Sequence, residues 1–137
     1  MNKLINISEA ASIALHSIVM IARSDKMINA NNISDELHFS KNHLSKILQT
    51  LVKYGYLNSI RGPKGGFTLK KNSVEICLLE IYEIFEGKIN TGHCALHNDV
   101  SCPFASCVFG GLTTKFSLEF QEHLKNKTIA DIINIKQ

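Results

Sequence analysis

The sequence predicts a mainly α-helical fold that carries one small β-hairpin. Most of the 137 residues fall into segments whose apolar positions recur with helical spacing. The exception is Ser59 to Leu69, where two short β-capable runs flank a turn rich in glycine and proline. Hydrophobic residues make up 45% of the chain and charged residues 20%, which is typical of a globular protein. A chain of this length has room for one domain with a helical extension.

Two helices are predicted before residue 38. Residues 7–22 are almost continuously apolar, and this run is too long for a strand, so we expect a buried helix. A short helix that ends at Leu37 should follow. Asn31 or Asn32 can cap it, and Asp35 and Glu36 would then lie in its first turns, where acidic side chains favour the helix dipole.

A third helix is predicted from Ser40 to Tyr54. Ser40 is a suitable N-cap, and Gly55 suits the left-handed position that ends a helix. The apolar positions form a single buried face: Leu44, Ile47, Leu48, Leu51 and Val52. Two short helices joined by a tight turn make a helix-turn-helix, whose second helix reads the major groove of DNA.

The hairpin after this helix is predicted to be a wing. Strands at 57–61 and 66–69 flank Pro63 and the Gly65-Gly66 pair, which supply the dihedral angles that a turn requires. The turn also carries Arg61 and Lys64, and arginine favours narrow, electronegative minor grooves. The predicted fold is therefore a winged helix-turn-helix.

The candidate DNA-contacting residues come from the start of the third helix and from the wing tip: Ser40, Asn42, His43, Ser45, Lys46, Arg61 and Lys64. Asparagine can bond adenine through two hydrogen bonds, and lysine can donate to guanine or to phosphate. Residues 1–71 hold ten cationic and four anionic side chains, a net charge of +6, whereas residues 72–137 hold five and eight, a net charge of −3. This asymmetry favours double-stranded DNA as a partner of the N-terminal half. The alternative is a solvated helix face beside an ordinary hairpin.

The C-terminal half is predicted to be helical around one irregular segment. A helix from Cys77 to Glu86 ends at Gly87, and residues 88–106 lack periodicity and form a loop. A long helix over about 107–125 carries an apolar stripe at Val108 or Phe109, Leu112, Phe116, Phe120 and Leu124. Thr128 and Asp131 form a capping box that opens a last short helix.

These elements divide the chain into two regions. Residues 1–72 are predicted to be the DNA-binding region, and residues 73–137 the cysteine loop with its following helices, all within one compact unit. The chain has no apolar run long enough to cross a membrane and no recognisable signal peptide, so we expect a cytoplasmic protein without a membrane partner. Cysteines stay reduced in that compartment.

Three cysteines, two in this loop and one directly after it, indicate a metal or cluster site. Cys94, Cys102 and Cys107 lie within 14 residues, and clustered thiols in a reducing compartment favour ligation over disulfides. Thiolates are the usual ligands of iron–sulfur clusters. His93, His97 and Asp99 are interleaved with these cysteines and could complete the site. Zinc fits less well, because tetrahedral zinc sites usually use ligand pairs two to four residues apart. Cys77 stands outside this group and is expected to be a small buried hydrophobe.

Two stretches carry a resemblance to a known family. The run from Phe39 to Gln49, followed by Gly55-Tyr56-Leu57, and the wing Arg61-Gly62-Pro63-Lys64-Gly65-Gly66-Phe67 resemble the Rrf-two (Rrf2) family of bacterial winged-helix transcription regulators. The similarity extends from about Ile7 to Ile133. Its members include the iron–sulfur regulator IscR and the nitric-oxide-responsive NsrR.

The resemblance implies a homodimer on a palindromic operator. The long C-terminal helix would be a dimerisation helix that packs against its mate. The positions that match Asn42, His43 and Ser45 would read bases, and the arginine that matches Arg61 would enter the minor groove.

The resemblance also bears on the cofactor. Cluster-binding members place three cysteines in this loop, with a fourth ligand that is either a histidine soon after the cysteines or a carboxylate from the partner's first helix. No histidine closely follows Cys107 here, and by this resemblance the first-helix ligand position falls near Ser12, with Glu9 one turn earlier. The resemblance therefore leaves the fourth ligand open among His93, His97, Glu9 and exogenous species. Other relatives lack a cluster and keep only a cysteine-proline pair such as Cys102-Pro103.

We therefore expect a transcriptional regulator, not an enzyme, that acts as a repressor and senses iron–sulfur cluster status, redox stress or nitric oxide. The cluster would be 2Fe-2S or 4Fe-4S and can be lost during purification. One alternative is a cluster-free regulator that responds to thiol oxidation, a metabolite or a partner protein. A more distant one is a thiol redox enzyme with Cys102 or Cys107 as nucleophile, which leaves the wing unexplained.

Overall fold

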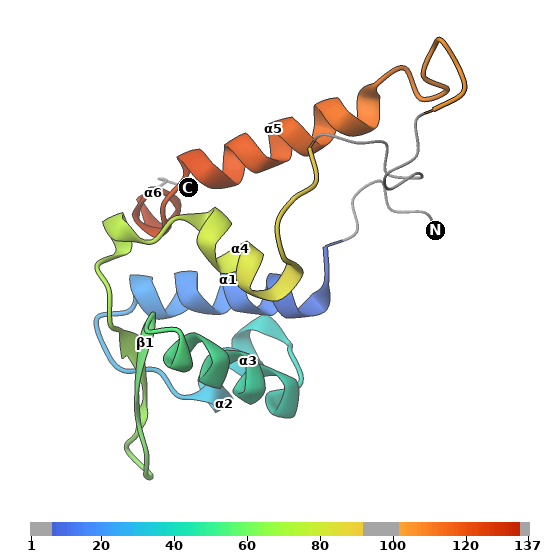
Figure 1. Cartoon of the computed structure of the whole chain (residues 1–137). Helices are drawn as coiled ribbons and strands as arrows, with labels where there is room; N and C mark the ends of the chain where they lie inside the picture. Colours follow the sequence, from blue (N-terminus) through green and yellow to red (C-terminus); the bar gives the residue numbers. More distant parts are fainter. Residues whose placement is uncertain (1–6, 92–101, 135–137) are drawn as a thin grey trace.

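The computed structural model describes residues 7–91 and 102–134 and has the predicted fold class (Figure 1). It is mainly helical with one antiparallel hairpin. The elements in order are α1 (Glu9–Arg23), α2 (Ala30–Leu37), α3 (Lys41–Lys53), β1 (Leu57–Ile60), β2 (Gly66–Leu69), the 3-10 turn η1 (Ser73–Glu75), α4 (Leu78–Glu86), α5 (Leu112–Asn126) and α6 (Ile129–Ile133).

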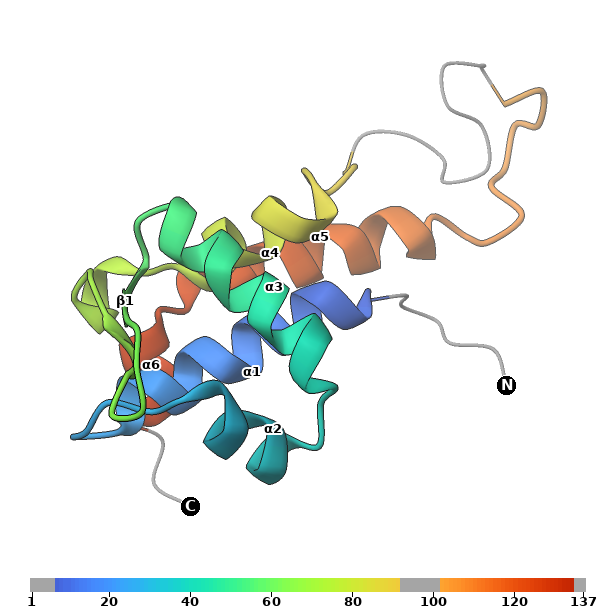
Figure 2. The same ribbon diagram turned by 90° about the horizontal axis from the view of Figure 1, so that it is seen from below.

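Helix α1 is the centre of the fold. It contacts α3, α4, α6 and β2, and its apolar residues Ile13, Ala14 and Ile18 are fully buried. Figure 1 shows α2 and α3 on one side of α1 and α4 with α5 on the other. Figure 2 shows the molecule from the side of α2 and α3. The Ser8 hydroxyl caps α1 by accepting the Ala11 N–H at 3.1 Å. The predicted helix over 7–22 is thus confirmed to within a residue or two at each end.

The start of α2 differs from the prediction. Asn29, rather than Asn31 or Asn32, caps the helix, because its side chain accepts the Asn32 N–H at 2.8 Å. Asp35 and Glu36 consequently lie in the last turn and not in the first. The prediction that these two residues interact favourably with the helix dipole is therefore wrong.

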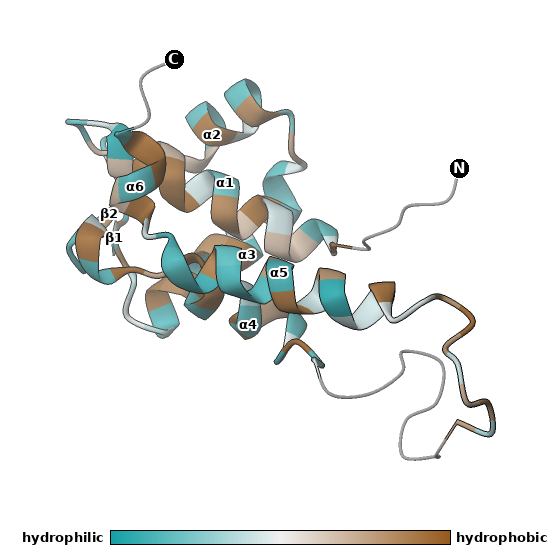
Figure 3. Cartoon of the chain, turned by 90° about the horizontal axis from the view of Figure 1, so that it is seen from above, coloured by the Kyte–Doolittle hydropathy of each residue, from teal (hydrophilic) through white to brown (hydrophobic). Residues whose placement is uncertain are grey.

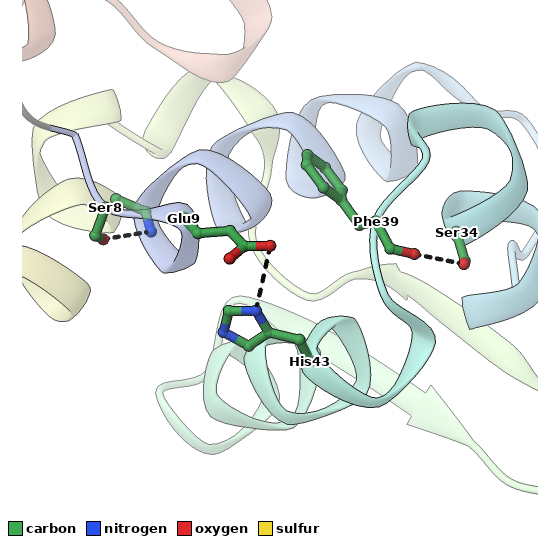
Figure 4. A network of polar contacts seen from close by, with 6 residues as sticks. Ser8, Glu9, Ser34, Phe39 and His43 are labelled. Atoms are coloured by element: carbon green, nitrogen blue, oxygen red, sulfur yellow. Dashed lines mark hydrogen bonds and ion pairs between the residues drawn. The ribbon is translucent and has the colours of Figure 1, made fainter. Parts of the chain in front are cut away.

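Glu36 has another role, and the end of α2 forms the predicted turn. Glu36 pairs with Arg23 of α1 at 2.7 Å across the exposed surface. His38 ends α2 in the left-handed conformation, with φ of 59°. The Ser34 hydroxyl donates to the Phe39 carbonyl at 2.7 Å, which closes the turn between α2 and α3 (Figure 4).

The wing is the predicted two-stranded hairpin, and a short third segment joins it. Leu57 pairs with Leu69 and Ile60 with Gly66 in the ladder. Ile28, between α1 and α2, forms a bridge to Phe67 through hydrogen bonds of 2.7 and 3.3 Å. A Cβ at Gly66 would lie 2.6 Å from the Ile28 carbonyl oxygen, so only glycine permits this approach. The bridge fixes the root of the wing on the helical body.

Helix α4 packs between α1 and α5, and its contact with α5 includes an edge-to-face pair of Tyr82 and Phe120, with ring centroids 5.4 Å apart. The predicted start of the long helix near residue 107 is wrong, because α5 begins at Leu112. Gly110 and Gly111 have φ of 63° and 72°, and this left-handed backbone interrupts the helix.

The last short helix is the one predicted. The Thr128 hydroxyl accepts the Asp131 N–H, and the Asp131 carboxylate accepts the Thr128 N–H, as a capping box requires. The interactions of the Thr128 N–H, and next of the Thr128 hydroxyl, with the carboxylate lower the pKa of Asp131. None of the helices within the described residues is long and apolar enough to cross a membrane.

Candidate nucleic-acid interface and cysteine segment

Helix α3 presents the predicted polar face to solvent. Its apolar residues Leu44, Leu48 and Leu51 are fully buried against the body. Among the predicted DNA-contacting residues, Ser40, Asn42 and Lys46 are exposed, and His43 and Ser45 are half-buried. Ser40 occupies the N-cap position, but its side chain makes no capping hydrogen bond. The first N–H groups of α3 therefore have no cap from the Ser40 side chain and are open to a ligand.

The wing tip is equally open. Arg61 and Lys64 are exposed, as is Ile60, at 57% of its full area. The turn between the strands is closed by a hydrogen bond of 2.9 Å from the Gly65 N–H to the Gly62 carbonyl. In Figure 1 the hairpin and α3 lie on the same side of α1, opposite α5. The structure thus brings the two groups of predicted residues to one side of the molecule.

His43, a predicted DNA contact, lies close to Glu9, a predicted metal ligand. The His43 Nδ1 atom lies 3.7 Å from an oxygen of Glu9, the first residue of α1 (Figure 4). The two side chains are 38% and 67% exposed, so solvent screens the pair and it contributes at most about 1 kcal/mol to stability. The contact places Glu9 beside the start of α3.

Of the predicted cluster ligands, the structure describes Cys102 and Cys107, which are free and exposed, and Glu9. Cys94, His93 and His97 lie outside the described residues. No three His, Cys, Asp or Glu side chains gather into a metal site within residues 7–91 and 102–134. The donor set that the structure describes is therefore two thiols on one segment, which suits a thiolate-bound group.

Cys107 has a backbone environment that favours its thiolate. Its interactions with the backbone of Gly111, Phe109 and Gly110 lower the pKa of the Cys107 thiol. The same turn is closed by the Gly110 N–H, which donates to the Cys107 carbonyl at 3.0 Å. A thiolate is both the metal-binding and the nucleophilic form of cysteine.

Cys77 makes polar contacts, whereas the sequence predicted a small buried hydrophobe at this position. It is half-buried at the N-cap of α4, and its S–H lies 3.2 Å from the carbonyl oxygens of Leu124 and Lys125. It thus satisfies carbonyls at the end of α5. A β-bridge between Cys77 and Thr128 strengthens this junction.

A contact that the sequence did not suggest joins the wing to α4. The Tyr56 hydroxyl donates to the Glu80 carboxylate at 2.8 Å, and the Lys71 ammonium lies 4.5 Å from the centre of the Tyr56 ring. Burial, followed by the hydrogen bond and charge of Glu80, raises the pKa of Tyr56 to about 12. No local sequence signal marks a pair 24 residues apart.

Helix α5 exposes large apolar side chains. Phe116 is 41% exposed, and most of the predicted stripe lies on the surface. In Figure 3 several segments of α5 have the brown colour of hydrophobic residues. A groove of about 820 Å³ runs between the end of α4 and α5. The exposed apolar residues of this region are Phe104, Val108, Phe109, Leu112, Phe116 and Leu118. Exposed apolar residues at this density make α5 a candidate interaction surface.

Comparison with known sequences identifies relatives over nearly the whole chain. A model of the Rrf2 family, described as iron-dependent transcriptional regulators, matches residues 7–135. The HTH-type transcriptional regulator NsrR of Bacillus licheniformis is 29% identical over 123 residues, which cover 88% of this chain and 86% of that protein. NsrR of Bacillus subtilis is 26% identical over 127 residues, with 90% and 87% covered.

Solved structures share the fold. The global cysteine regulator CymR of B. subtilis superposes with a TM-score of 0.75 at 20% identity, covering 98% of this chain and all of CymR. IscR of T. potens gives a TM-score of 0.71 at 18% identity, covering 98% and 94%. With the family match over residues 7–135, the chain belongs to the Rrf2 family of winged-helix transcriptional regulators, DNA-binding proteins rather than enzymes.

Proposed function

We propose that this protein is a homodimeric repressor that binds a palindromic operator. Its affinity for the operator would change when the cysteine segment, residues 94–107, gains or loses an iron–sulfur cluster. One observation carries the DNA-binding part: the open polar face of α3 and the cationic wing tip lie on the same side of α1. Binding to chromosomal DNA would make the cytoplasm its site of action. The regions 1–72 and 73–137 would divide DNA binding from sensing and dimerisation.

Each predicted contact has a definite chemical role in this proposal. Asn42 would bond adenine through two hydrogen bonds, and Lys46 would donate to guanine or phosphate. His43, Ser45 and Ser40 would supply further contacts to base edges or phosphates. Arg61 would enter the minor groove beside the major groove that α3 occupies, with Lys64 on the phosphates.

Selection of binding sites from randomised duplex DNA tests this proposal. The Asn42→Ala variant tests the role of a single residue in it. Wild-type protein should enrich a two-fold symmetric site with half-sites about one helical turn apart. The variant should bind that site about 1 kcal/mol more weakly and lose its base preference at one position in each half-site. Gln49→Ala, an exposed change further along α3, is the control and should keep the preference. Failure to enrich any sequence would refute the proposal.

The apolar face of α5 supports a homodimer. Two copies would bury the exposed stripe against each other and place two winged helices on one operator. The stripe sits on the far side of α1 from α3 and the wing, so its burial leaves the DNA-binding side open.

Phe116→Glu should convert the dimer to a monomer, because a carboxylate cannot be buried in an apolar interface without a partner. Sedimentation velocity would show the change in mass, and affinity for a palindrome should fall towards that for a single half-site. Gln121→Glu introduces the same residue about 140° around α5 and should stay dimeric. An unchanged dimer in the Phe116 variant would place the interface elsewhere.

The proposed sensor uses Cys94, Cys102 and Cys107, with His93, His97 or Glu9 as the fourth ligand. The family description as iron-dependent and the favoured Cys107 thiolate support this assignment. When bound, a 2Fe-2S or 4Fe-4S cluster would supply a group that reacts with oxidants and nitric oxide. The protein's own residues would hold it and transmit its presence.

A cluster-free sensor is the second candidate, and the exposed Cys107 favours it. An exposed thiol whose pKa is lowered is more readily oxidised than an ordinary one, so the same segment could respond to peroxide without metal. In that case operator affinity should change with peroxide in metal-free protein and recover with dithiothreitol. A metabolite or a partner protein that acts on the α5 groove is a further form of the cluster-free reading.

A further inference from the structure

We infer that Tyr56 and Glu80 are positioning residues that couple the wing and the reading helix to α4, and through α4 to the cysteine segment. This inference rests on the proposed function, since it requires a signal that arises in the cysteine segment and a response in DNA binding. It assigns the transmission of that signal to one side-chain hydrogen bond.

The backbone of Tyr56 already joins the two DNA-binding elements. Its N–H donates to the Leu51 carbonyl at 3.0 Å, which caps the end of α3. Its carbonyl accepts the Lys70 N–H at 2.9 Å, just beyond the end of β2. A displacement of Tyr56 therefore moves the end of the reading helix and the root of the wing together.

The side chain of Tyr56 extends this junction to α4. Tyr56 is only 8% exposed, and its hydroxyl reaches Glu80, in the first turn of α4, at 2.8 Å. Lys71 covers the ring at 4.5 Å from its centre. The phenol stays protonated at neutral pH and remains a donor to the carboxylate. A charged acceptor makes this hydrogen bond stronger than a neutral one.

The other end of α4 lies beside the backbone that follows Cys107, because Glu86 and Gly87 line one groove together with Val108, Phe109 and Gly110. Glu86, the last residue of α4, accepts the Ser8 N–H at 2.9 Å, and Gly87 follows with φ of 77°. Only about 9 Å of helix separates Glu80 from Glu86, at 1.5 Å per residue. A nine-residue helix this short moves as a rigid body, so a shift of its C-terminal end reaches Glu80. In Figure 1, α4 lies between α1 and α5 and links the two sides of the molecule.

The closing experiment measures operator affinity in two states, cluster-loaded and after removal of the cluster by a chelator. The ratio of the two affinities is the coupling. Tyr56→Phe removes the hydroxyl alone and should lower this ratio by about 2- to 30-fold, the range of single-residue coupling effects. Tyr54→Phe makes the same change two residues earlier, at a side chain 57% exposed, and should leave the ratio unchanged.

Variants of the acceptor separate positioning from stability. Glu80→Gln keeps an oxygen that accepts from Tyr56 and should retain most of the ratio. Glu80→Ala should lower it as Tyr56→Phe does, and the double variant should lower it no further. Amide hydrogen exchange of residues 66–70 gives a second readout: loading should change it in the wild type and not in Tyr56→Phe.

The outcomes distinguish this inference from the proposed function. A wild-type ratio of one would overturn cluster sensing and the coupling with it. A wild-type ratio well above one that Tyr56→Phe leaves intact would overturn the coupling alone. Equal weakening of both affinities in Tyr56→Phe would reduce the contact to a structural one and also overturn the inference.

Discussion

Arg61→Ala should weaken operator binding by about 1–3 kcal/mol at fixed salt, roughly a 5- to 150-fold rise in Kd. Arg61 is exposed at the wing tip, so its guanidinium is free to enter a narrow minor groove, where the electrostatic potential is most negative. The loss should be largest for operators with an A·T-rich tract at the position that the wing reaches. Fluorescence anisotropy with labelled duplexes at two salt concentrations would measure it.

Arg61→Lys is the matched variant, because it keeps the charge and loses the planar fork. If the wing reads groove width, lysine should restore only part of the affinity and none of the preference for A·T tracts. Full restoration by lysine would mean that Arg61 contacts phosphate only. Because the side chain is exposed, neither variant should change Tm appreciably, and an unchanged Kd for Arg61→Ala would remove the wing from the interface.

The elements with strong local signals were predictable from the sequence. The buried face of α3 follows from apolar residues at i, i+3, i+4 and i+7, and each of Leu44, Ile47, Leu48 and Leu51 is buried as that spacing requires. The wing follows from its glycines, and α6 follows from the capping box at Thr128. In each case the information lies within a few neighbouring residues.

The wrong predictions concern helix boundaries at which more than one residue or pattern could set the end of the helix. Residues 29, 31 and 32 are all asparagine, and any of them can cap a helix, so composition alone does not choose Asn29. The apolar spacing through Val108 and Phe109 continues that of α5, but Gly110 and Gly111 adopt left-handed backbone and end the periodic segment. There the conformational freedom of glycine outweighs the hydrophobic pattern.

Only part of the candidate site could be predicted from the sequence, because some of its contacts join segments that are far apart along the chain. Residue types predict that α3 and the wing carry DNA-binding side chains, yet they do not predict which distant residues meet. The Ile28 bridge to Phe67 and the Tyr56 bond to Glu80 join segments whose approach is set by the packing of α1 against its neighbours. The cluster ligands remain a prediction, since Cys94 lies outside the described residues.

Replacement of Cys94, Cys102 and Cys107 by alanine should abolish iron binding altogether. Three thiolates are the proposed protein ligands, and the one histidine or carboxylate that remains cannot hold a cluster alone. Protein purified without oxygen should lose its visible absorbance and its iron and sulfide, while the far-ultraviolet circular dichroism stays unchanged. The operator affinity of this variant should match that of chelator-treated wild type, because both lack the same group.

Cys77→Ala is the matched control for that experiment. It removes a thiol that contacts the Leu124 and Lys125 carbonyls at 3.2 Å and lies outside the cysteine segment. It should keep the full iron and sulfide content and lose about 1 kcal/mol of stability, since two carbonyls at the end of α5 lose a weak donor. Iron retained by the triple variant would contradict the cluster assignment. Iron lost by Cys77→Ala as well would move part of the site to the junction of α4 and α5.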